Sequence, residues 1–174
     1  MATGGHLLML LRHGIAEDAA PGESDAERRL TGEGKRKVRE VAAGMRALKL
    51  PVDVILTSPL RRARETAEVV AAEHDLDETS VIVTPALAPA AAREALFAAI
   101  GSHARADGIV VVGHQPDLGE LASVLLVGTP GLVPLPFKKA GLAGISVVSL
   151  PPRGAGTLEF FLTPGQLRRI GRGD

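Results

Sequence analysis

The stretch Leu7-Leu8-Met9-Leu10-Leu11-Arg12-His13-Gly14 joins an uninterrupted apolar run to a strongly polar end. An apolar run of this length without alternation is typical of a β-strand covered on both faces, as in a parallel sheet. Arg12 and His13 follow the run directly, so we expect them at the carboxyl end of that strand. In an open α/β sheet the carboxyl ends of the strands line the ligand crevice. The stretch therefore predicts a buried strand with two functional side chains at its end.

Two further apolar runs end in a similar way. The run Val52 to Leu56 precedes Thr57-Ser58-Pro59-Leu60-Arg61-Arg62-Ala63, and the run Ile109 to Val112 precedes Gly113-His114-Gln115-Pro116. A serine N-cap followed by proline at the first helical position predicts a helix that starts at Ser58 and carries arginines in its first turn. Three distant segments can thus bring two imidazoles and at least two guanidiniums to one sheet edge. This combination indicates phosphoryl transfer through a histidine.

The rest of the chain alternates between predicted helices and strands. Further strands are predicted at Val81 to Val83, Gly144 to Leu150 and Thr157 to Leu162. Helices are predicted after Thr31 as N-cap, from Ser58 to about His74, from Ala90 to Ile100, and from Leu118 to Leu126 with Asp117 as N-cap. The last two strands are expected to form a hairpin at one sheet edge. The alternation predicts an α/β fold, a single three-layer α/β/α sandwich with a mostly parallel central sheet. We expect one domain over residues 1–174.

The composition argues against several classes of protein. Lys plus Arg and Asp plus Glu are 20 each, so no global charge draws the chain to nucleic acid. Aromatic residues make up 2%, without Trp or Tyr, which argues against stacking platforms for bases. The chain has no cysteine, so disulfides and a cysteine nucleophile are excluded. No apolar run approaches the roughly 20 residues that cross a bilayer, and Leu7 to Leu11 is too short for a signal-peptide core. We therefore expect a cytoplasmic protein with neither nucleic-acid nor membrane partners.

The three strand-end segments, in this order, resemble the histidine phosphatase superfamily and its phosphoglycerate mutase-like fold. Its motifs are Arg-His-Gly after the first strand, Ser-x-x-x-Arg-Ala at the start of a helix and a later Gly-His. The chain is most similar to the compact SixA-type phosphohistidine phosphatase branch. That similarity rests on Leu11-Arg12-His13-Gly14-Ile15-Ala16-Glu17, on the segment from Asp25 to Gly34, on the segment from Thr57 to Ala67, on Gly113-His114-Gln115-Pro116 and on Phe137-Lys138-Lys139-Ala140-Gly141-Leu142.

The resemblance implies a role for each residue of these motifs. His13 would attack phosphorus and form a phosphohistidine that water then cleaves. Arg12 and Arg62 would clamp the phosphoryl oxygens, and Gly14 would belong to the same phosphate-binding motif. His114 would donate a further hydrogen bond to the phosphoryl group, although the residues alone leave open which histidine is the nucleophile. Nearby guanidinium charges would keep the nucleophile unprotonated. The resemblance implies neither a metal nor a cofactor.

Three further candidates lie in the polar segment after the first strand. Arg28 matches the branch pattern Asp-x-x-Arg-x-Leu-Thr, and it would either bind phosphate or substrate or form a structural pair with Asp25. Mutase-like relatives carry a glutamate general acid after the third strand, but the segment from Thr84 to Ala90 contains no acidic residue. Glu17 and Asp18, close to the predicted nucleophile, are the alternative proton donors.

The missing acid bears on the substrate. A phosphoramidate has a nitrogen leaving group that takes its proton from solvent, so it depends least on a general acid. The sequence therefore predicts a phosphatase that removes the phosphoryl group from phosphohistidine on a protein, such as a histidine phosphotransfer domain. Two alternatives stay open. One is a general small-molecule phosphomonoesterase acting on a sugar phosphate, nucleotide or polyphosphate, and the other is an inactive phosphate-binding module.

Overall fold

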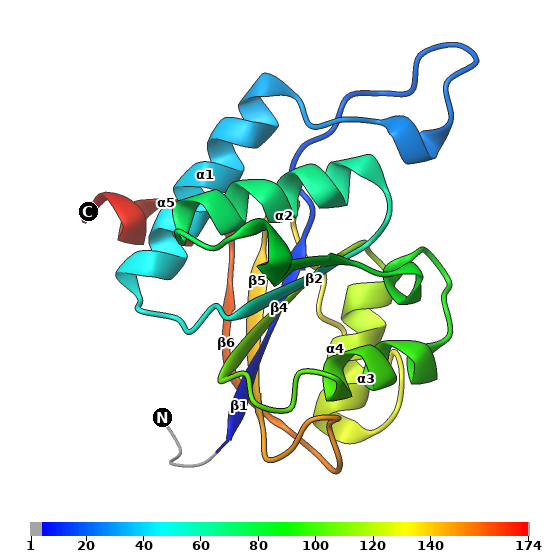
Figure 1. The fold of residues 1–174 in the computed structure, drawn as a ribbon, viewed down its shortest axis with the longest axis vertical. Helices are drawn as coiled ribbons and strands as arrows, with labels where there is room; N and C mark the ends of the chain where they lie inside the picture. Colours follow the sequence, from blue (N-terminus) through cyan, green and yellow to red (C-terminus); the bar gives the residue numbers. More distant parts are fainter. Residues whose placement is uncertain (1–4, 174) are drawn as a thin grey trace.

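A computed structural model describes residues 5–173, in which one six-stranded sheet lies between helices (Figure 1). The elements in chain order are β1 (His6–Arg12), η1 (Asp25–Glu27), α1 (Gly32–Ala47), β2 (Val54–Thr57), α2 (Arg61–Glu73), η2 (Glu78–Ser80), β3 (Val81–Val83), η3 (Pro85–Leu87), α3 (Arg93–Gly101), β4 (Gly108–Gly113), α4 (Asp117–Val127), β5 (Leu142–Val147), β6 (Thr157–Leu162) and α5 (Pro164–Arg172). Within these residues, no helix combines the length and the apolar character needed to cross a membrane.

The strands are arranged in the order β3-β2-β4-β1-β5-β6. Parallel pairs join β3 to β2, β2 to β4 and β4 to β1, whereas β5 runs antiparallel to both β1 and β6. The sheet is therefore mixed and mostly parallel, as predicted. The predicted hairpin is also confirmed, since β5 and β6 pair with each other and β6 forms one edge of the sheet.

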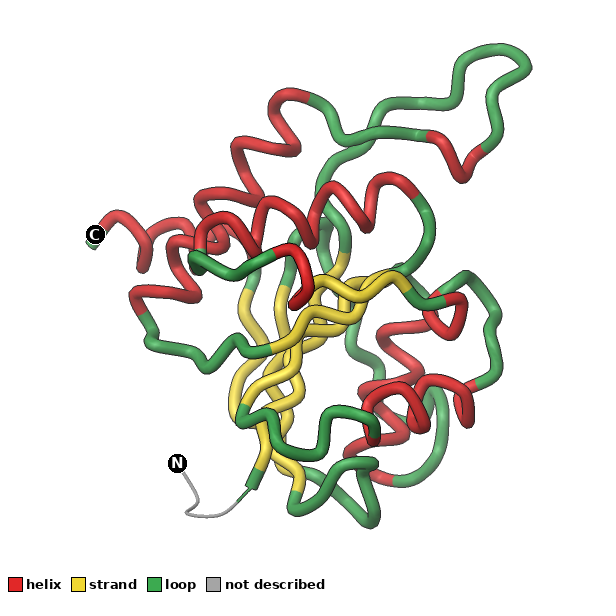
Figure 2. Tube along the Cα trace, viewed as in Figure 1, coloured by secondary structure: helices red, strands yellow, loops and turns green. Residues whose placement is uncertain are grey.

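Helices cover both faces of the sheet, so the fold has three layers (Figures 1 and 2). The side chains of β1 show how the two cores are built. Met9 and Leu11 pack on one face with apolar residues of α1, α2 and α5, and Leu8 and Leu10 pack on the other with those of α3 and α4. All four side chains have no exposed surface. The continuous apolar run thus forms a strand buried on both faces, as predicted.

Helix α1 is held close to the chain that follows β1. Thr31 caps the helix by accepting a hydrogen bond from the amide of Gly34, as predicted. A Cβ atom at Gly34 would lie 2.1 Å from the carbonyl oxygen of Ile15, so only glycine allows this approach. The close contact places the start of α1 directly beside the segment that carries the first histidine.

The predicted start of α2 is wrong. The helix begins at Arg61 with Leu60 as its N-cap, and Ser58 lies before it in the turn after β2. The hydroxyl oxygen of Ser58 accepts a hydrogen bond from the amide of Leu60 at 3.3 Å and lies 2.7 Å from Nε2 of His114. Ser58 does not cap the helix because a tertiary contact fixes its side chain in the turn.

The predicted cap of α4 is wrong for a similar reason. Asp117 is the first residue of the helix, after Pro116 as N-cap. Its carboxylate accepts a hydrogen bond from the amide of Ala90, which lies before α3. Helix α3 itself begins at Arg93, and Ala90, where the prediction placed its start, has a φ of 59°. The Asp117 side chain is thus used to hold a neighbouring loop.

Candidate active site

The carboxyl ends of β1, β2 and β4 place their polar residues at one edge of the sheet. The amide of His13 donates to the carbonyl of Gly113 at 3.1 Å, and the amide of Ser58 donates to that of Val112 at the same distance. The imidazole rings of His13 and His114 lie with their centroids 5.1 Å apart, tilted by 54°. The structure therefore brings the two predicted histidines together from segments a hundred residues apart.

His13 is buried and its ring is oriented by the neighbouring backbone. Nδ1 lies 2.7 Å from the carbonyl oxygen of Gly14, which only accepts hydrogen bonds. Nδ1 therefore carries the proton, and Nε2 carries the free electron pair. Burial lowers the pKa of His13 to about 3, opposed by the Gly14 contact and reinforced by the charges of His114, Arg62 and Arg12. His13 is thus a neutral imidazole at neutral pH, chiefly because of burial rather than because of the arginines.

Gly14 acts on the site through its carbonyl group. Its amide donates to Oγ1 of Thr66 at 3.1 Å, and that hydroxyl donates to the carbonyl of Arg62. A Cβ atom at Gly14 would lie 2.6 Å from Cγ2 of Val38. Close packing between β1 and α1 thus sets the position of the Gly14 carbonyl that orients His13.

His114 contacts Ser58 through one ring nitrogen and leaves the other ring nitrogen without a partner among the described residues. Ser58 Oγ accepts from a backbone amide, so its own proton is free to point at Nε2 of His114, 2.7 Å away. When Ser58 donates in this contact, the ring proton of neutral His114 is on Nδ1, which is buried and has no hydrogen-bond partner among residues 5–173. Burial lowers the pKa of His114 to about 4, with the charge of Arg62 as the next cause. An unpaired, buried Nδ1–H is a costly group unless a ligand accepts from it.

Each of the two predicted phosphate-binding arginines is held by a backbone carbonyl. Nη1 of Arg12 donates to Phe137 at 2.7 Å. Arg62, whose residue surface is 7% exposed, donates from Nη1 to the carbonyl of Asp25 at 2.7 Å and from Nη2 to its carboxylate at 2.9 Å. Both arginines are close enough to act on the pKa of His13. The predicted group of two imidazoles and two guanidiniums is therefore assembled at one place.

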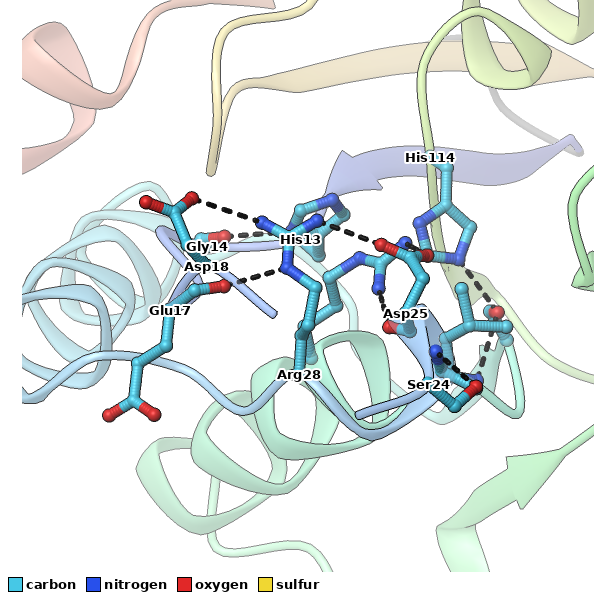
Figure 3. Close-up of polar contacts among 12 residues, drawn as sticks. His13, Gly14, Glu17, Asp18, Ser24, Asp25, Arg28 and His114 are labelled. Carbon is cyan, nitrogen blue, oxygen red and sulfur yellow. Dashed lines mark hydrogen bonds and ion pairs between the residues drawn. The ribbon is translucent and has the colours of Figure 1, made fainter. Parts of the chain in front are cut away.

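Arg28 lies at the edge of this group and contacts Asp25 (Figure 3). Asp25 also pairs with Arg62. Its Nη1 donates to Asp25 Oδ1 at 2.9 Å, while its Nε donates to the carbonyl of Glu17 at 2.7 Å. Hydrogen bonds from Arg28 and then Arg62 lower the pKa of the Asp25 carboxyl group. The pair with Asp25 thus forms, and it also places Arg28 next to a site arginine.

The comparisons with known proteins agree with this geometry. A model of the histidine phosphatase superfamily (branch 1) matches residues 8–92. The chain is 31% identical to phosphohistidine phosphatase SixA of Escherichia coli over 165 residues, which cover 92% of this chain and 96% of SixA. The chain belongs to the histidine phosphatase superfamily.

Two other matches extend over most of this histidine phosphatase. An uncharacterized protein of a Picosynechococcus strain is 41% identical over 140 residues, or 79% of this chain and 83% of the relative. A structure of the protein histidine phosphatase SixA complexed with tungstate superimposes with a TM-score of 0.79 at 28% identity, covering 92% of this chain and 99% of that one. The mixed, mostly parallel α/β architecture is therefore that of SixA and its phosphoglycerate mutase-like relatives.

The two alternative proton donors of this histidine phosphatase lie away from its histidine pair. The Glu17 carboxylate pairs with Nε of Arg29 at 2.8 Å, and Figure 3 shows its side chain directed away from His13. The Asp18 side chain is fully exposed and lies 4.0 Å from Arg28. Neither carboxylate faces the imidazoles, so the geometry does not support either residue as the acid.

Sequence reasoning missed the side chains that hold the site residues of the histidine phosphatase in place. The sequence predicts Ser58 as a helix cap and Asp25 as a structural partner of Arg28, and it gives no indication of a role for Thr66. The one local signal was that Ser58 and Asp25 lie inside the motifs of the family pattern. Among residues 5–173, no group of three or more His, Asp or Glu side chains is placed to hold a metal ion.

Proposed function

We propose that this histidine phosphatase removes the phosphoryl group from phosphohistidine on a protein, with His13 as the covalent nucleophile. The observation that carries the proposal is the pair of buried, neutral imidazoles beside Arg12 and Arg62. One ring offers a free electron pair and the other an unpaired N–H. A phosphoryl group needs an attacking atom and donors for its oxygens, and these four side chains supply both.

The proposed reaction has two steps at phosphorus. In the first, His13 Nε2 forms a bond to phosphorus while the bond from phosphorus to the leaving group breaks and its electron pair stays with that group. Arg12, Arg62 and Nδ1–H of His114 would stabilise the phosphoryl oxygens in the transition state. In the second, a water oxygen attacks phosphorus, the bond to Nε2 breaks, and the water proton leaves with phosphate.

The carbonyl of Gly14 has a specific part in the second step. Because it accepts from Nδ1–H of His13, the phosphorylated ring keeps its second proton and carries a positive charge. Such a ring leaves phosphorus as a neutral imidazole, which is a far better leaving group than an imidazolide anion. The contact therefore favours hydrolysis of the intermediate, and it also orients Nε2 towards the phosphorus atom that it attacks.

The relatives support the substrate class. SixA of Escherichia coli, 31% identical over 92% of this chain, is named a phosphohistidine phosphatase. The related SixA structure was solved with tungstate, a tetrahedral oxyanion like phosphate. The exposed positions of Glu17 and Asp18 also fit a substrate that needs little help from an acid. A phosphorylated protein, such as a histidine phosphotransfer domain, is the proposed partner.

The test is phosphate release by wild type and by His13→Ala, on a phosphohistidine peptide and on a panel of phosphomonoesters. We expect turnover of the peptide that the substitution abolishes, together with an acid-labile phosphoenzyme in the wild type. Activity that survives in His13→Ala would exclude the covalent mechanism. Preference for one of the phosphomonoesters would keep the mechanism and assign a small-molecule substrate, and an inactive wild type would favour the phosphate-binding module.

A further inference from the structure

A small cavity adjoins His114 on the side of α3 and α4. Its volume is about 220 Å³, and its walls include Gly113 and His114 at the end of β4. The remaining walls combine apolar side chains with three charged residues, which are Arg93, Asp117 and Glu120. Sites for drug-sized ligands have roughly 300–1,000 Å³, so this cavity suits a group of a few ring atoms.

The carboxylate of Asp117 is the charged group of the cavity nearest in the chain to His114. Its Oδ2 accepts a hydrogen bond from the amide of Ala90 at 3.2 Å, which fixes the side chain against another wall of the cavity. That is the only hydrogen bond of this carboxylate among the described residues, so Oδ1 keeps its capacity to accept. Asp117 is also close enough to act on His114, whose pKa its charge raises.

We propose that this cavity receives the leaving group and that Asp117 selects a leaving group with an N–H, as in the imidazole of phosphohistidine. The inference rests on the proposed function and adds to it the residue that would distinguish a phosphoramidate from a phosphomonoester. The leaving ring is small and combines apolar ring atoms with a polar N–H, and the cavity likewise has both apolar and charged walls. Asp117 Oδ1 would accept from the ring nitrogen that does not carry phosphorus.

The chemistry explains why a carboxylate helps at this place. A phosphorylated imidazole leaves readily when its second nitrogen is protonated, because a neutral imidazole then departs. An ionised carboxylate that accepts from this N–H stabilises the protonated, reactive form of the substrate. As the bond between phosphorus and the ring nitrogen breaks, its electron pair returns to that nitrogen, and the N–H stays on the ring. Asp117 therefore takes up and gives up no proton.

A phosphomonoester offers nothing comparable. Its leaving oxygen has no N–H for Oδ1, and when the leaving group is p-nitrophenol it departs as a stable anion without help from a donor. Hydrolysis of p-nitrophenyl phosphate should therefore depend on His13 but not on Asp117. This difference separates a role in substrate selection from a general role in folding or phosphate binding.

The experiment compares kcat/KM of wild type, Asp117→Asn and Glu120→Gln on phosphoimidazole and on p-nitrophenyl phosphate. Asparagine keeps an oxygen that accepts from Ala90, so we expect the loop contact and the Tm to be retained. Charge-assisted hydrogen bonds support a loss of roughly 10- to 100-fold on phosphoimidazole, with less than about a twofold change on p-nitrophenyl phosphate. Glu120→Gln removes the same charge from an exposed wall of the cavity and should change neither value.

An equal loss on both substrates, or no loss on phosphoimidazole, would overturn the role of Asp117. Failure of wild type to hydrolyse phosphoimidazole, with p-nitrophenyl phosphate still cleaved through His13, would overturn the inference and leave a phosphatase. Failure on both substrates would instead overturn the proposed function, and the inference with it.

Discussion

Replacement of Ser58 by alanine is expected to weaken catalysis through His114. Ser58 has no exposed surface, and its hydroxyl lies 2.7 Å from Nε2 of the His114 ring. The substitution leaves Nε2 buried without a partner, so the tautomer that presents Nδ1–H to a phosphoryl oxygen loses its preference. A net neutral hydrogen bond contributes about 0.5–1.5 kcal/mol, and an unsatisfied buried group costs about 1–3 kcal/mol. A loss near 1.4 kcal/mol corresponds to roughly a tenfold lower kcat.

The assay is steady-state hydrolysis of p-nitrophenyl phosphate, in a cycle with His114→Ala. Because Ser58 is expected to act only through His114, Ser58→Ala should lower kcat about tenfold in the wild type and not at all in the His114→Ala background. Ser123→Ala is the matched control, since Ser123 is also fully buried and donates to the carbonyl of Thr129 at 2.6 Å. It should lower the Tm without lowering kcat.

Two results would refute the reasoning. If Ser58→Ala lowered kcat by the same factor with and without His114, the serine would act on the substrate directly or through the fold. If Ser123→Ala lowered kcat as much as Ser58→Ala does, the loss would reflect general destabilisation rather than the orientation of the ring.

Three other changes test the hydrogen bonds, protonation and packing of the site. Asp25→Asn should lower kcat/KM several-fold because it weakens the ion pair that positions Arg62. The free energy of unfolding should change by less than about 1 kcal/mol, since the Asp25 side chain is 61% exposed. Unchanged kinetics would contradict this expectation. Unfolded His13 takes up a proton below its ordinary pKa of about 6.5, whereas the buried ring does so only near 3. Denaturant titrations should therefore show the free energy of unfolding falling by about 2 kcal/mol from this residue between pH 7 and pH 5, a loss absent in His13→Ala. Gly34→Ala should lower the free energy of unfolding by roughly 3 kcal/mol, because its Cβ would clash with the carbonyl oxygen of Ile15. Gly32→Ala is the control, since its Cβ would meet open space, and thermal unfolding should show little change in its Tm.

The sheet could be predicted because its central strands are locally encoded. The apolar runs that end at Leu11 and Val112 have no alternation, and both form strands buried on both faces. Their polar ends then had to meet at one edge, which is a property of parallel strands rather than of this chain. The two histidines were found in this way, whereas the family resemblance singled out Arg62 over Arg61 and assigned the roles of all three residues.

Helix starts and hydrogen-bond partners were harder to predict from the sequence. Ser58 and Asp117 have the residue types of N-caps, and local propensity favoured that role for both. In the structure each side chain instead contacts a residue from another segment, Ser58 with His114 and Asp117 with Ala90. Glu17 and Asp18 are near His13 in sequence, but the chain turns them towards Arg29 and Arg28 rather than towards the imidazoles.

The sequence by itself determined the layers of the fold, the strand-end position of the site and the identity of its imidazoles and guanidiniums. These depend on apolar periodicity and on short motifs, which are properties of neighbouring residues. Only the tertiary structure decided which nitrogen of each imidazole lacks a hydrogen-bond partner. It also decided which guanidinium nitrogens of Arg12 and Arg62 are already hydrogen-bonded within the protein. Apart from Gly14, which adjoins His13 in the chain, the partners that settle these points are distant in sequence: 125 residues away for Arg12, 56 for the pair of Ser58 and His114, and 37 for Arg62. Folding brings such pairs within hydrogen-bond distance, and no local pattern specifies them.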